Sequence, residues 1–204
     1  MYSLILERTV YTVDQLVPLA TPQVALAGRS NVGKSSLVNC LAGRKRELAK
    51  VSATPGKTRS LNFYRVEQHD LVLVDLPGYG YAKCSKKERE SWSRLIAAYF
   101  RQVTSALKAT VVLIDCRHTP QRLDLELAAF LQHQRIPLVP VLTKADKCKQ
   151  NERAARMREW NTLLAGVEPL LFSSKTGYGR DTLWRRLLAF AGEECIPPEA
   201  PASS

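Results

Sequence analysis

The sequence has no apolar run of about 18 residues, the length at which a segment becomes a candidate membrane-spanning helix. Its N-terminus has no basic region followed by an apolar core and a cleavage site, as a secretory signal would have. The five cysteines are odd in number and widely spread, with no Cys-x-x-Cys pair and no Cys/His cluster at zinc spacing. These absences exclude a transmembrane protein, a disulfide scaffold and a structural zinc site. We therefore expect a protein of the reducing cytoplasm.

Acidic residues are also few: 19 Asp and Glu stand against 30 Lys and Arg, a net charge of +11. This balance favours a polyanionic partner such as RNA. With 204 residues, 45% of them hydrophobic, the chain can form one domain with extensions. We expect that domain at residues 23–192 in a monomer. Residues 1–22, with a possible edge strand at 3–10, should pack on the domain, and residues 193–204 should form a disordered tail.

Short apolar runs alternate with amphipathic stretches along the domain. The second and third runs flank a short polar turn, which favours an antiparallel hairpin. The pattern predicts a doubly wound α/β fold, with a mostly parallel six-stranded sheet that contains one antiparallel strand. Ligands of such a fold bind beyond the C-terminal ends of the strands. The predicted strands are 23–27, 61–66, 71–74, 110–114, 137–142 and 169–172, and the predicted helices are 36–41, 92–107, 123–131, 157–164 and 183–190.

A phosphate-binding motif follows the first predicted strand of the domain. It has the form G-x-x-x-x-G-K-S between a strand and a helix, which is typical of a P-loop NTPase. Backbone N–H groups of such a loop surround phosphate oxygens. We expect Lys34 to reach the β- and γ-phosphates and the Ser35 hydroxyl to bind Mg²⁺. The nucleotide-binding residues predicted here are Gly28, Arg29, Ser30, Asn31, Val32, Gly33, Lys34, Ser35 and Ser36.

Three later segments, each at the end of a predicted strand, favour GTP over ATP. Asp75 can hold Mg²⁺ through water, and Gly78 can donate its N–H to a γ-phosphate. Asp146 can accept the two donors of guanine, which adenine lacks, and the Lys144 stem can lie along the base. A backbone N–H near Ser173 can meet guanine O6. The predicted contacts are Asp75, Leu76, Pro77, Gly78, Thr143, Lys144, Ala145, Asp146, Phe172, Ser173 and Ser174.

The motifs GRSNVGKSS, TPGKTRS, DLPGYGYAK, TKAD and FSSKTG together resemble the YihA/EngB branch of the Era-like GTPases. The resemblance covers roughly residues 5–192. It implies GTP and GDP binding with Mg²⁺, and a role in assembly of the large ribosomal subunit and in cell division and septation. Thr143 stands where many GTPases have an asparagine that braces the P-loop, so we expect that bracing to be partly rebuilt.

By resemblance, the polar stretch 44–60 is the first switch loop. Thr58 would close over Mg²⁺ and the γ-phosphate, with Thr54 as the alternative. Ser35 and Thr58 are thus the predicted metal ligands, and Lys34, Thr58 and Gly78 the predicted catalytic residues. The nucleotide contacts predicted in this loop are Gly56, Lys57, Thr58, Arg59 and Ser60.

Tyr79 follows Gly78 where Ras-like GTPases have a water-orienting glutamine, which predicts slow hydrolysis, on the order of 10⁻⁴ per second. Asn31 resembles the residue that helps to hold K⁺ in potassium-dependent relatives, so K⁺ is a further candidate cofactor. Asn31 as a local turn former and Arg29 as an internal arginine finger are the alternatives.

By resemblance, the second switch loop runs from Gly78 through Cys84 into the helix after Lys86. Basic residues gather around both switch loops, which favours an RNA partner, here the large ribosomal subunit or its rRNA. Tyr79, Tyr81 and Phe63 can stack on bases or pack on the sheet. A nucleotide-gated adaptor for division proteins is the alternative function. A small-molecule kinase is less favoured, since no Arg-rich lid is found. The basic residues are Arg44, Lys45, Arg46, Lys50, Lys57, Arg59, Lys83, Lys86, Lys87 and Arg89.

Overall fold

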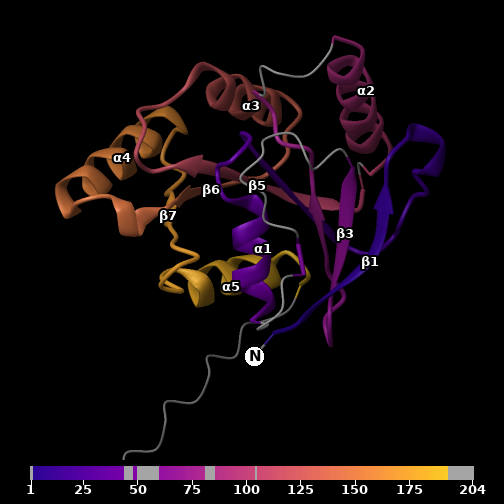
Figure 1. Cartoon of the computed structure of the whole chain (residues 1–204), viewed down its shortest axis with the longest axis horizontal. Helices are drawn as coiled ribbons and strands as arrows, with labels where there is room; N and C mark the ends of the chain where they lie inside the picture. The colour runs from indigo at the N-terminus through magenta and orange to yellow at the C-terminus, as the bar shows by residue number, and fades with distance from the viewer. Residues whose placement is uncertain (1, 44–47, 50–59, 81–85, 104, 193–204) are drawn as a thin grey trace, which may run out of the picture.

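A seven-stranded sheet forms the centre of the protein, whose computed structural model describes residues 2–43, 48–49, 60–80, 86–103 and 105–192 (Figure 1). The spatial order is β1-β3-β4-β2-β5-β6-β7. β3 runs antiparallel to both of its neighbours, and the remaining pairs are parallel. The strands are β1 (Leu4–Val10), β2 (Gln23–Gly28), β3 (Leu61–Val66), β4 (Val72–Asp75), β5 (Leu107–Asp115), β6 (Leu138–Thr143) and β7 (Leu170–Leu171).

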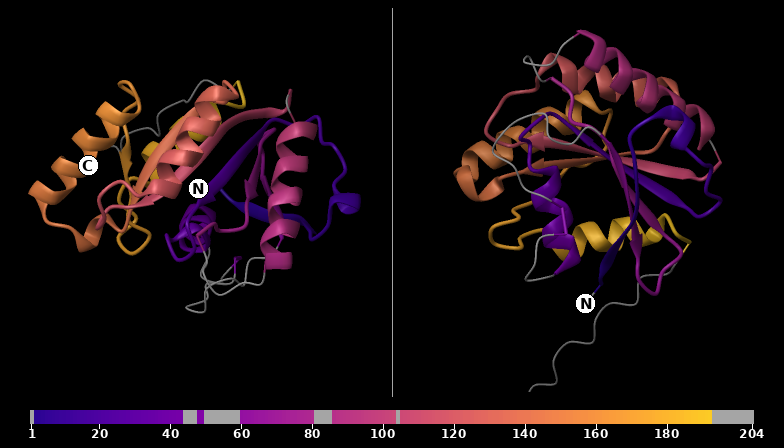
Figure 2. Two further views of the ribbon diagram at one scale, coloured as in Figure 1. Left: turned by 90° about the horizontal axis from the view of Figure 1, so that it is seen from above. Right: turned by 45° about the vertical axis from the view of Figure 1, so that its right-hand side comes forward.

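Helices cover both faces of this sheet, as the turned views in Figure 2 show. α1 (Lys34–Ala42) and α5 (Arg180–Ala189) pack on one face. α2 (Lys86–Gln102), α3 (Arg122–His133) and α4 (Gln150–Leu163) pack on the other. Two short 3₁₀ helices, η1 (Val13–Gln15) and η2 (Ala145–Lys147), complete the described elements. The predicted doubly wound α/β class is confirmed.

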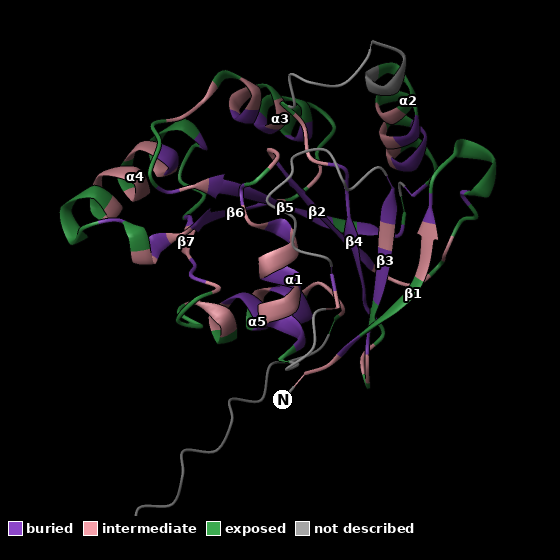
Figure 3. Cartoon of the chain, viewed as in Figure 1, coloured by how far each residue is buried: buried purple, intermediate pink, exposed green. Residues whose placement is uncertain are grey.

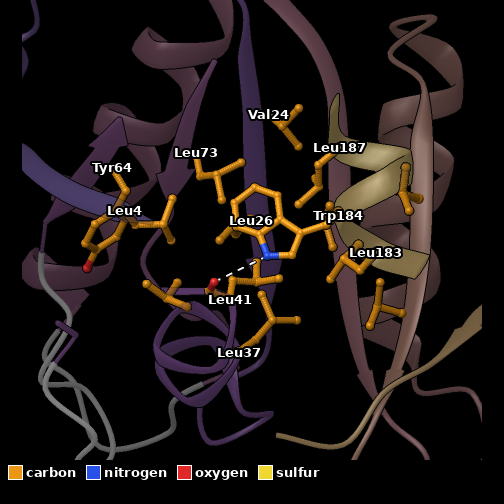
Figure 4. Close-up of a cluster of buried hydrophobic side chains, with 14 of the residues drawn as sticks. Leu4, Val24, Leu26, Leu37, Leu41, Tyr64, Leu73, Leu183, Trp184 and Leu187 are labelled. Carbon is orange, nitrogen blue, oxygen red and sulfur yellow. Dashed lines mark hydrogen bonds between the residues drawn. The ribbon is translucent and has the colours of Figure 1, made fainter. Parts of the chain in front are cut away.

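Side-chain alternation along β2 explains why both faces need cover. Val24 and Leu26 point into the core shared with α1 and α5, whereas Ala25 and Ala27 point into the core beneath α2. All six residues of β2 are buried, and Figure 3 shows the buried strands at the centre of the molecule. Trp184 of α5 fills the first core and donates a hydrogen bond from Nε1 to the carbonyl oxygen of Leu41, at 3.3 Å (Figure 4).

The sheet has seven strands and not six, because the N-terminal segment joins it. β1 pairs antiparallel with β3, from Leu4 opposite Val66 to Val10 opposite Leu61. Leu4 and Val10 are buried, which ties this edge strand to the core. The predicted hairpin is confirmed, since β3 and β4 pair antiparallel. The predicted C-terminal tail lies outside the described residues.

The helix predicted at residues 92–107 is too long at its C-terminal end. α2 ends at Gln102 and β5 begins at Leu107. Val103 and Leu107 are buried in the same core as Leu95 and Tyr99 of α2. The apolar stripe therefore continues across the end of the helix, and apolar spacing alone does not mark that end.

Candidate functional site

The P-loop joins the end of β2 to the start of α1, and its shape depends on small residues. A methyl group on Gly28 would lie 2.9 Å from the carbonyl oxygen of Leu113, and also 2.9 Å from Val32 Cγ1, so a larger residue would collide with both. Gly33 has a φ of +110° and Asn31 a φ of +64°, values that glycine and asparagine tolerate best. Because Gly33 directly precedes α1, this turn leads the chain into a helix N-terminus, which favours anions.

Lys34 and Asp75 are two buried charged residues of this site, and each acts on the charge of the other. Lys34 is 8% exposed and Asp75 is 1% exposed. Burial lowers the pKa of Lys34 and raises the pKa of Asp75 to about 6, and each shift is opposed by the charge of the other residue. Asp75 Oδ1 is buried and accepts no hydrogen bond from the described residues. This free carboxylate oxygen, at the end of β4, fits a Mg²⁺ ion held through water.

Gly78 lies directly against the P-loop. A methyl group on it would be 3.0 Å from Lys34 Nζ and 3.1 Å from the backbone nitrogen of Ser30. The Ser30 hydroxyl is 3.4 Å from the carbonyl oxygen of Gly78. The structure thus brings the P-loop, including Lys34, together with the Asp75–Gly78 segment. These two parts of the chain are far apart in sequence, since Lys34 and Asp75 are separated by 41 positions.

Thr143, at the end of β6, braces the P-loop with its hydroxyl group. Thr143 Oγ1 lies 2.7 Å from the carbonyl oxygen of Val32 and 3.0 Å from that of Ile114. The residue is 3% exposed. A threonine hydroxyl has one proton, so it can donate fully to one of these carbonyls at a time. This contact supplies the bracing that we expected to be rebuilt where many GTPases have asparagine.

Lys144 makes a second connection to the same loop. Its ammonium donates to the carbonyl oxygen of Asn31, at 2.7 Å, and to Asp115 Oδ2, at 2.8 Å. Arg117 binds the same carboxylate through two nitrogens, at 2.9 and 2.7 Å. Burial alone would raise the pKa of Asp115, but the hydrogen bonds from Arg117 and Lys144 outweigh it and hold that pKa well below its usual range. Asp115 therefore acts as a fixed negative charge that orients Lys144.

The last two motifs meet beyond the ends of β6 and β7. Ser173 donates to Asp146 Oδ1 at 2.7 Å, and the backbone N–H of Ala145 donates to the carbonyl oxygen of Phe172 at 3.1 Å. The hydrogen bond from Ser173 lowers the pKa of Asp146, so the carboxylate is ionised at neutral pH. Ser173 is buried and Asp146 is half-buried. One carboxylate oxygen is thus tied to Ser173, and Oδ2 is left to face a ligand.

Comparison with known proteins decides the family. A sequence model of the family described as 50S ribosome-binding GTPase matches residues 23–144. The chain is 64% identical over 189 residues to the probable GTP-binding protein EngB of Oleidesulfovibrio alaskensis, which covers 92% of this chain and 86% of that protein. The chain belongs to the EngB family of GTPases.

Further EngB relatives agree with this result. Identity is 59% to the probable GTP-binding protein EngB of Desulfovibrio desulfuricans, over 96% of each chain. It is 46% to that of Geobacillus thermodenitrificans, over 88% of this chain and 92% of the relative. A crystal structure of a probable EngB superposes with a TM-score of 0.66 at 21% identity, covering 84% of this chain and 99% of that one. Aquifex aeolicus Era superposes with a TM-score of 0.68 at 22% identity, covering 88% and 59%. These two similarities show the shared fold.

Part of the predicted EngB-type site lies outside the described residues, namely Gly56, Lys57, Thr58 and Arg59 of the first switch loop and the alternative Thr54. Ser60 is described: it is buried and its hydroxyl lies 3.3 Å from Asn62 Oδ1. All ten residues of the predicted basic cluster are likewise outside the described residues or have undescribed side chains: Arg44, Lys45, Arg46, Lys50, Lys57, Arg59, Lys83, Lys86, Lys87 and Arg89.

Sequence reasoning missed two carboxylates of this EngB-type site, Asp115 and Asp124. Asp115 stands at the C-terminal end of β5, a buried strand next to β2, and the other site residues also follow strand ends. Its position in the sequence could therefore have indicated a site residue. Asp124 lies in the first turn of α3 and gave no such signal. Phe63, which could have stacked on bases, is 1% exposed and packs in the core. No helix in the described part of the chain is long and apolar enough to cross a membrane.

The hydroxyl of Thr143 is open to a direct test by Thr143→Val, which keeps the shape of the side chain. We expect GDP affinity to fall about 5- to 10-fold, because one neutral hydrogen bond contributes about 1 kcal/mol and its loss leaves a buried carbonyl unpaired. Calorimetric titration measures the change. Thr143→Ser, which keeps the hydroxyl, should retain most of the affinity.

Thr110→Val is the matched control for that experiment. Thr110 is fully buried in β5, and its hydroxyl has no hydrogen-bond partner among the described residues. Its replacement should leave GDP affinity unchanged and should not lower stability. Equal losses of GDP affinity in Thr143→Val and Thr110→Val would contradict a specific bracing role for Thr143.

Proposed function

We propose that this GTPase is a nucleotide-dependent switch that binds the large ribosomal subunit or its rRNA during subunit assembly, and on which normal cell division and septation depend. The observation that carries the proposal is the joining of four motifs at one edge of the sheet: Lys144 binds the P-loop, and Ser173 fixes Asp146. The net charge of +11 supports a polyanionic partner. The family description, 50S ribosome-binding GTPase, supports the ribosome as that partner.

In this proposal, each motif has one task. Asp146 accepts the N1–H and N2–H₂ donors of guanine, and Ala145, Phe172, Ser173 and Ser174 shape the base pocket with Thr143 and Lys144. The loop from Gly28 to Ser36 surrounds the phosphates, and Lys34 and the N–H of Gly78 contact the γ-phosphate. Gly56 to Ser60 close over it, and Leu76 and Pro77 position the backbone between Asp75 and Gly78.

Ser35 and Thr58 would hold Mg²⁺, with Asp75 acting through water, and the bound metal would neutralise charge on the β- and γ-phosphates. The proposal makes hydrolysis slow, on the order of 10⁻⁴ per second without a stimulating partner, because Tyr79 has no amide to orient the attacking water. The Tyr79 hydroxyl is instead bonded to Asp124, at 2.7 Å. A ribosomal particle is the proposed source of stimulation.

A potassium ion is a further proposed cofactor, with Asn31 as one ligand near the α- and γ-phosphates. Asn31 has left-handed backbone geometry and donates no side-chain hydrogen bond to the described residues, which suits either a turn former or a ligand. We expect faster GTP hydrolysis in KCl than in NaCl, measured by phosphate release. Equal rates in the two salts would remove potassium from the proposal.

Binding to ribosomal particles tests the main proposal. We expect purified protein to sediment with large ribosomal subunits more strongly in a GTP analogue than in GDP, because the switch loops form the proposed contact surface. We also propose that the protein acts in the cytoplasm as a monomer. With about six phosphate contacts, the logarithm of affinity should fall with the logarithm of salt concentration with a slope of about −4.

An affinity that ignores salt or the bound nucleotide would count against ribosomal RNA as the partner. The alternative function, an adaptor for division proteins without RNA binding, predicts no sedimentation with ribosomal subunits under either nucleotide. Co-sedimentation therefore separates the two functions in one experiment.

A further inference from the structure

The first turn of α3 touches the segment that follows Gly78. The Tyr79 hydroxyl donates to Asp124 Oδ1 at 2.7 Å. Asp124 is 3% exposed, although its side chain is acidic and it lies in the first turn of a surface helix. A methyl group on Gly80 would lie 3.1 Å from Leu123 Cδ1 and 3.5 Å from Arg29 Nε. The Tyr79–Gly80 corner is therefore enclosed between α3 and the P-loop.

The backbone of Tyr79 is paired with the P-loop at the same time. Arg29 and Tyr79 form an isolated parallel bridge. The N–H of Ser30 donates to the carbonyl oxygen of Tyr79 at 2.9 Å, and the N–H of Tyr79 donates to the carbonyl oxygen of Gly28 at 3.3 Å. The Tyr79 side chain thus binds α3 while its main chain binds the loop, so one residue joins three segments.

Charge supports the same arrangement. Burial raises the pKa of Asp124, and the hydrogen bond from Tyr79 and the positive charge of Arg29 oppose that rise. A hydrogen bond buried away from water is also electrostatically stronger than the same bond in water. Because Asp124 is buried and its bond to the Tyr79 hydroxyl is short, this contact influences where the Gly78–Tyr79 segment lies.

The position of that segment bears on the γ-phosphate. Gly78 packs against Lys34 and Ser30, and in the proposed function Lys34 and the N–H of Gly78 both contact the γ-phosphate. A γ-phosphate that binds both groups has to enter at this contact, so the segment has to move away from the loop to admit it. GDP has no γ-phosphate and needs no such movement.

We propose that Asp124 is a positioning residue that, through the Tyr79 hydroxyl, holds the Gly78–Tyr79 segment against the P-loop and so favours GDP over GTP. The inference rests on the proposed GTP-dependent switch. It assigns to α3 a role in nucleotide preference, because α3 supplies the anchor that the γ-phosphate must displace.

Two independent substitutions remove the anchor: Tyr79→Phe deletes the hydroxyl, and Asp124→Ala deletes its acceptor. Calorimetric titration in Mg²⁺ buffer gives the affinity of each variant for GDP and for a non-hydrolysable GTP analogue. We expect affinity for the analogue to rise about 10-fold relative to GDP, the change that corresponds to about 1.4 kcal/mol. Asp124→Asn keeps a carbonyl acceptor and should shift the ratio less.

The double variant and two controls complete the test. Because both substitutions break the same hydrogen bond, the double variant should change the ratio of the two affinities as much as one substitution does, and not by the product of two such changes. Tyr11→Phe and Asp14→Asn change the same residue types at exposed positions of the N-terminal segment and should leave the ratio unchanged. A general loss of stability would weaken both nucleotides together and would not move the ratio.

Three results would overturn the inference. An unchanged ratio in Tyr79→Phe and Asp124→Ala, with both nucleotides still bound, would overturn it and leave the proposed switch intact. A shift of the ratio toward GDP would place the contact in the GTP-bound state and would also overturn it. A wild-type protein that binds neither nucleotide would overturn the proposed function together with the inference.

Discussion

Asp146→Asn is expected to change the nucleotide preference from guanosine to xanthosine triphosphate by about 100-fold or more, because a site built on hydrogen bonds strongly rejects a ligand with mismatched groups. Guanine presents two donors to a carboxylate, whereas xanthine has an oxygen in place of the amino group. Ser173 binds Oδ1 of Asp146 at 2.7 Å. In the variant the amide oxygen can keep this contact, which leaves the amide N–H₂ to donate to xanthine.

Competition binding of a fluorescent guanine nucleotide against GTP, XTP and ATP measures that change. Asp181→Asn is the control, because Asp181 lies in α5 with its side chain 81% exposed and pairs with the neighbouring Arg180. It should keep the wild-type preference for GTP. If Asp146→Asn binds GTP and XTP as the wild type does, Asp146 does not read the base, and the proposed guanine pocket is wrong.

Periodic patterns and local motifs explain what could be predicted from the sequence. β2 is a continuous apolar run because both of its faces are covered. The P-loop is recognisable because glycine at residues 28 and 33 is required by close backbone approach and by a positive φ. These signals are local, so no knowledge of the folded chain was needed to read them.

Contacts between distant segments explain what could not be predicted. The Thr143 hydroxyl and the Val32 carbonyl are 111 residues apart in sequence, and no pattern in the sequence near either residue predicts the contact. The hydrogen bond from Tyr79 to Asp124 is of the same kind, since an acidic residue in the first turn of a helix is commonly read as favourable to the helix dipole. The order of the strands in the sheet decides which strand ends lie side by side. The sequence indicates that order only through its resemblance to a known family.

The C-terminal end of α2 could not be predicted, for a different reason. That end depends on tertiary packing, which continues an apolar pattern across a change in secondary structure. Leu107 extends the stripe of α2 although it belongs to β5. The edge strand expected at residues 3–10, by contrast, forms as β1, with buried ends and an exposed centre.

Lys34→Met should lower affinity for GTP about 100-fold or more, because it removes charge-assisted hydrogen bonds to the phosphates that contribute about 1.5 to 3 kcal/mol each. Methionine keeps the apolar stem of the lysine, so packing changes little. Lys108→Met is the control, since Lys108 is exposed at the start of β5, where its ammonium donates to the Ser105 carbonyl oxygen. Calorimetric titration should show wild-type affinity in the control. A Lys34→Met variant within about threefold of wild type would mean that the ammonium does not contact the phosphates.

The same substitution should also change how stability depends on pH, through Asp75. Burial raises the folded-state pKa of Asp75 to about 6, from an ordinary value of 3.8. A carboxyl group with a raised folded pKa contributes stability that is present at low pH and is lost as pH rises from about 4 through 6. Removal of Lys34 takes away the charge that opposes this shift, so the folded pKa of Asp75 rises further. The nucleotide-free variant should therefore lose stability relative to wild type as pH rises above about 6, and this difference should be smallest near pH 5.

Thermal unfolding of both proteins between pH 5 and 8 measures this difference in stability, and subtracting the wild-type curve removes the titration of groups common to both. A difference that does not change with pH would show that Lys34 and Asp75 are not coupled in the folded protein.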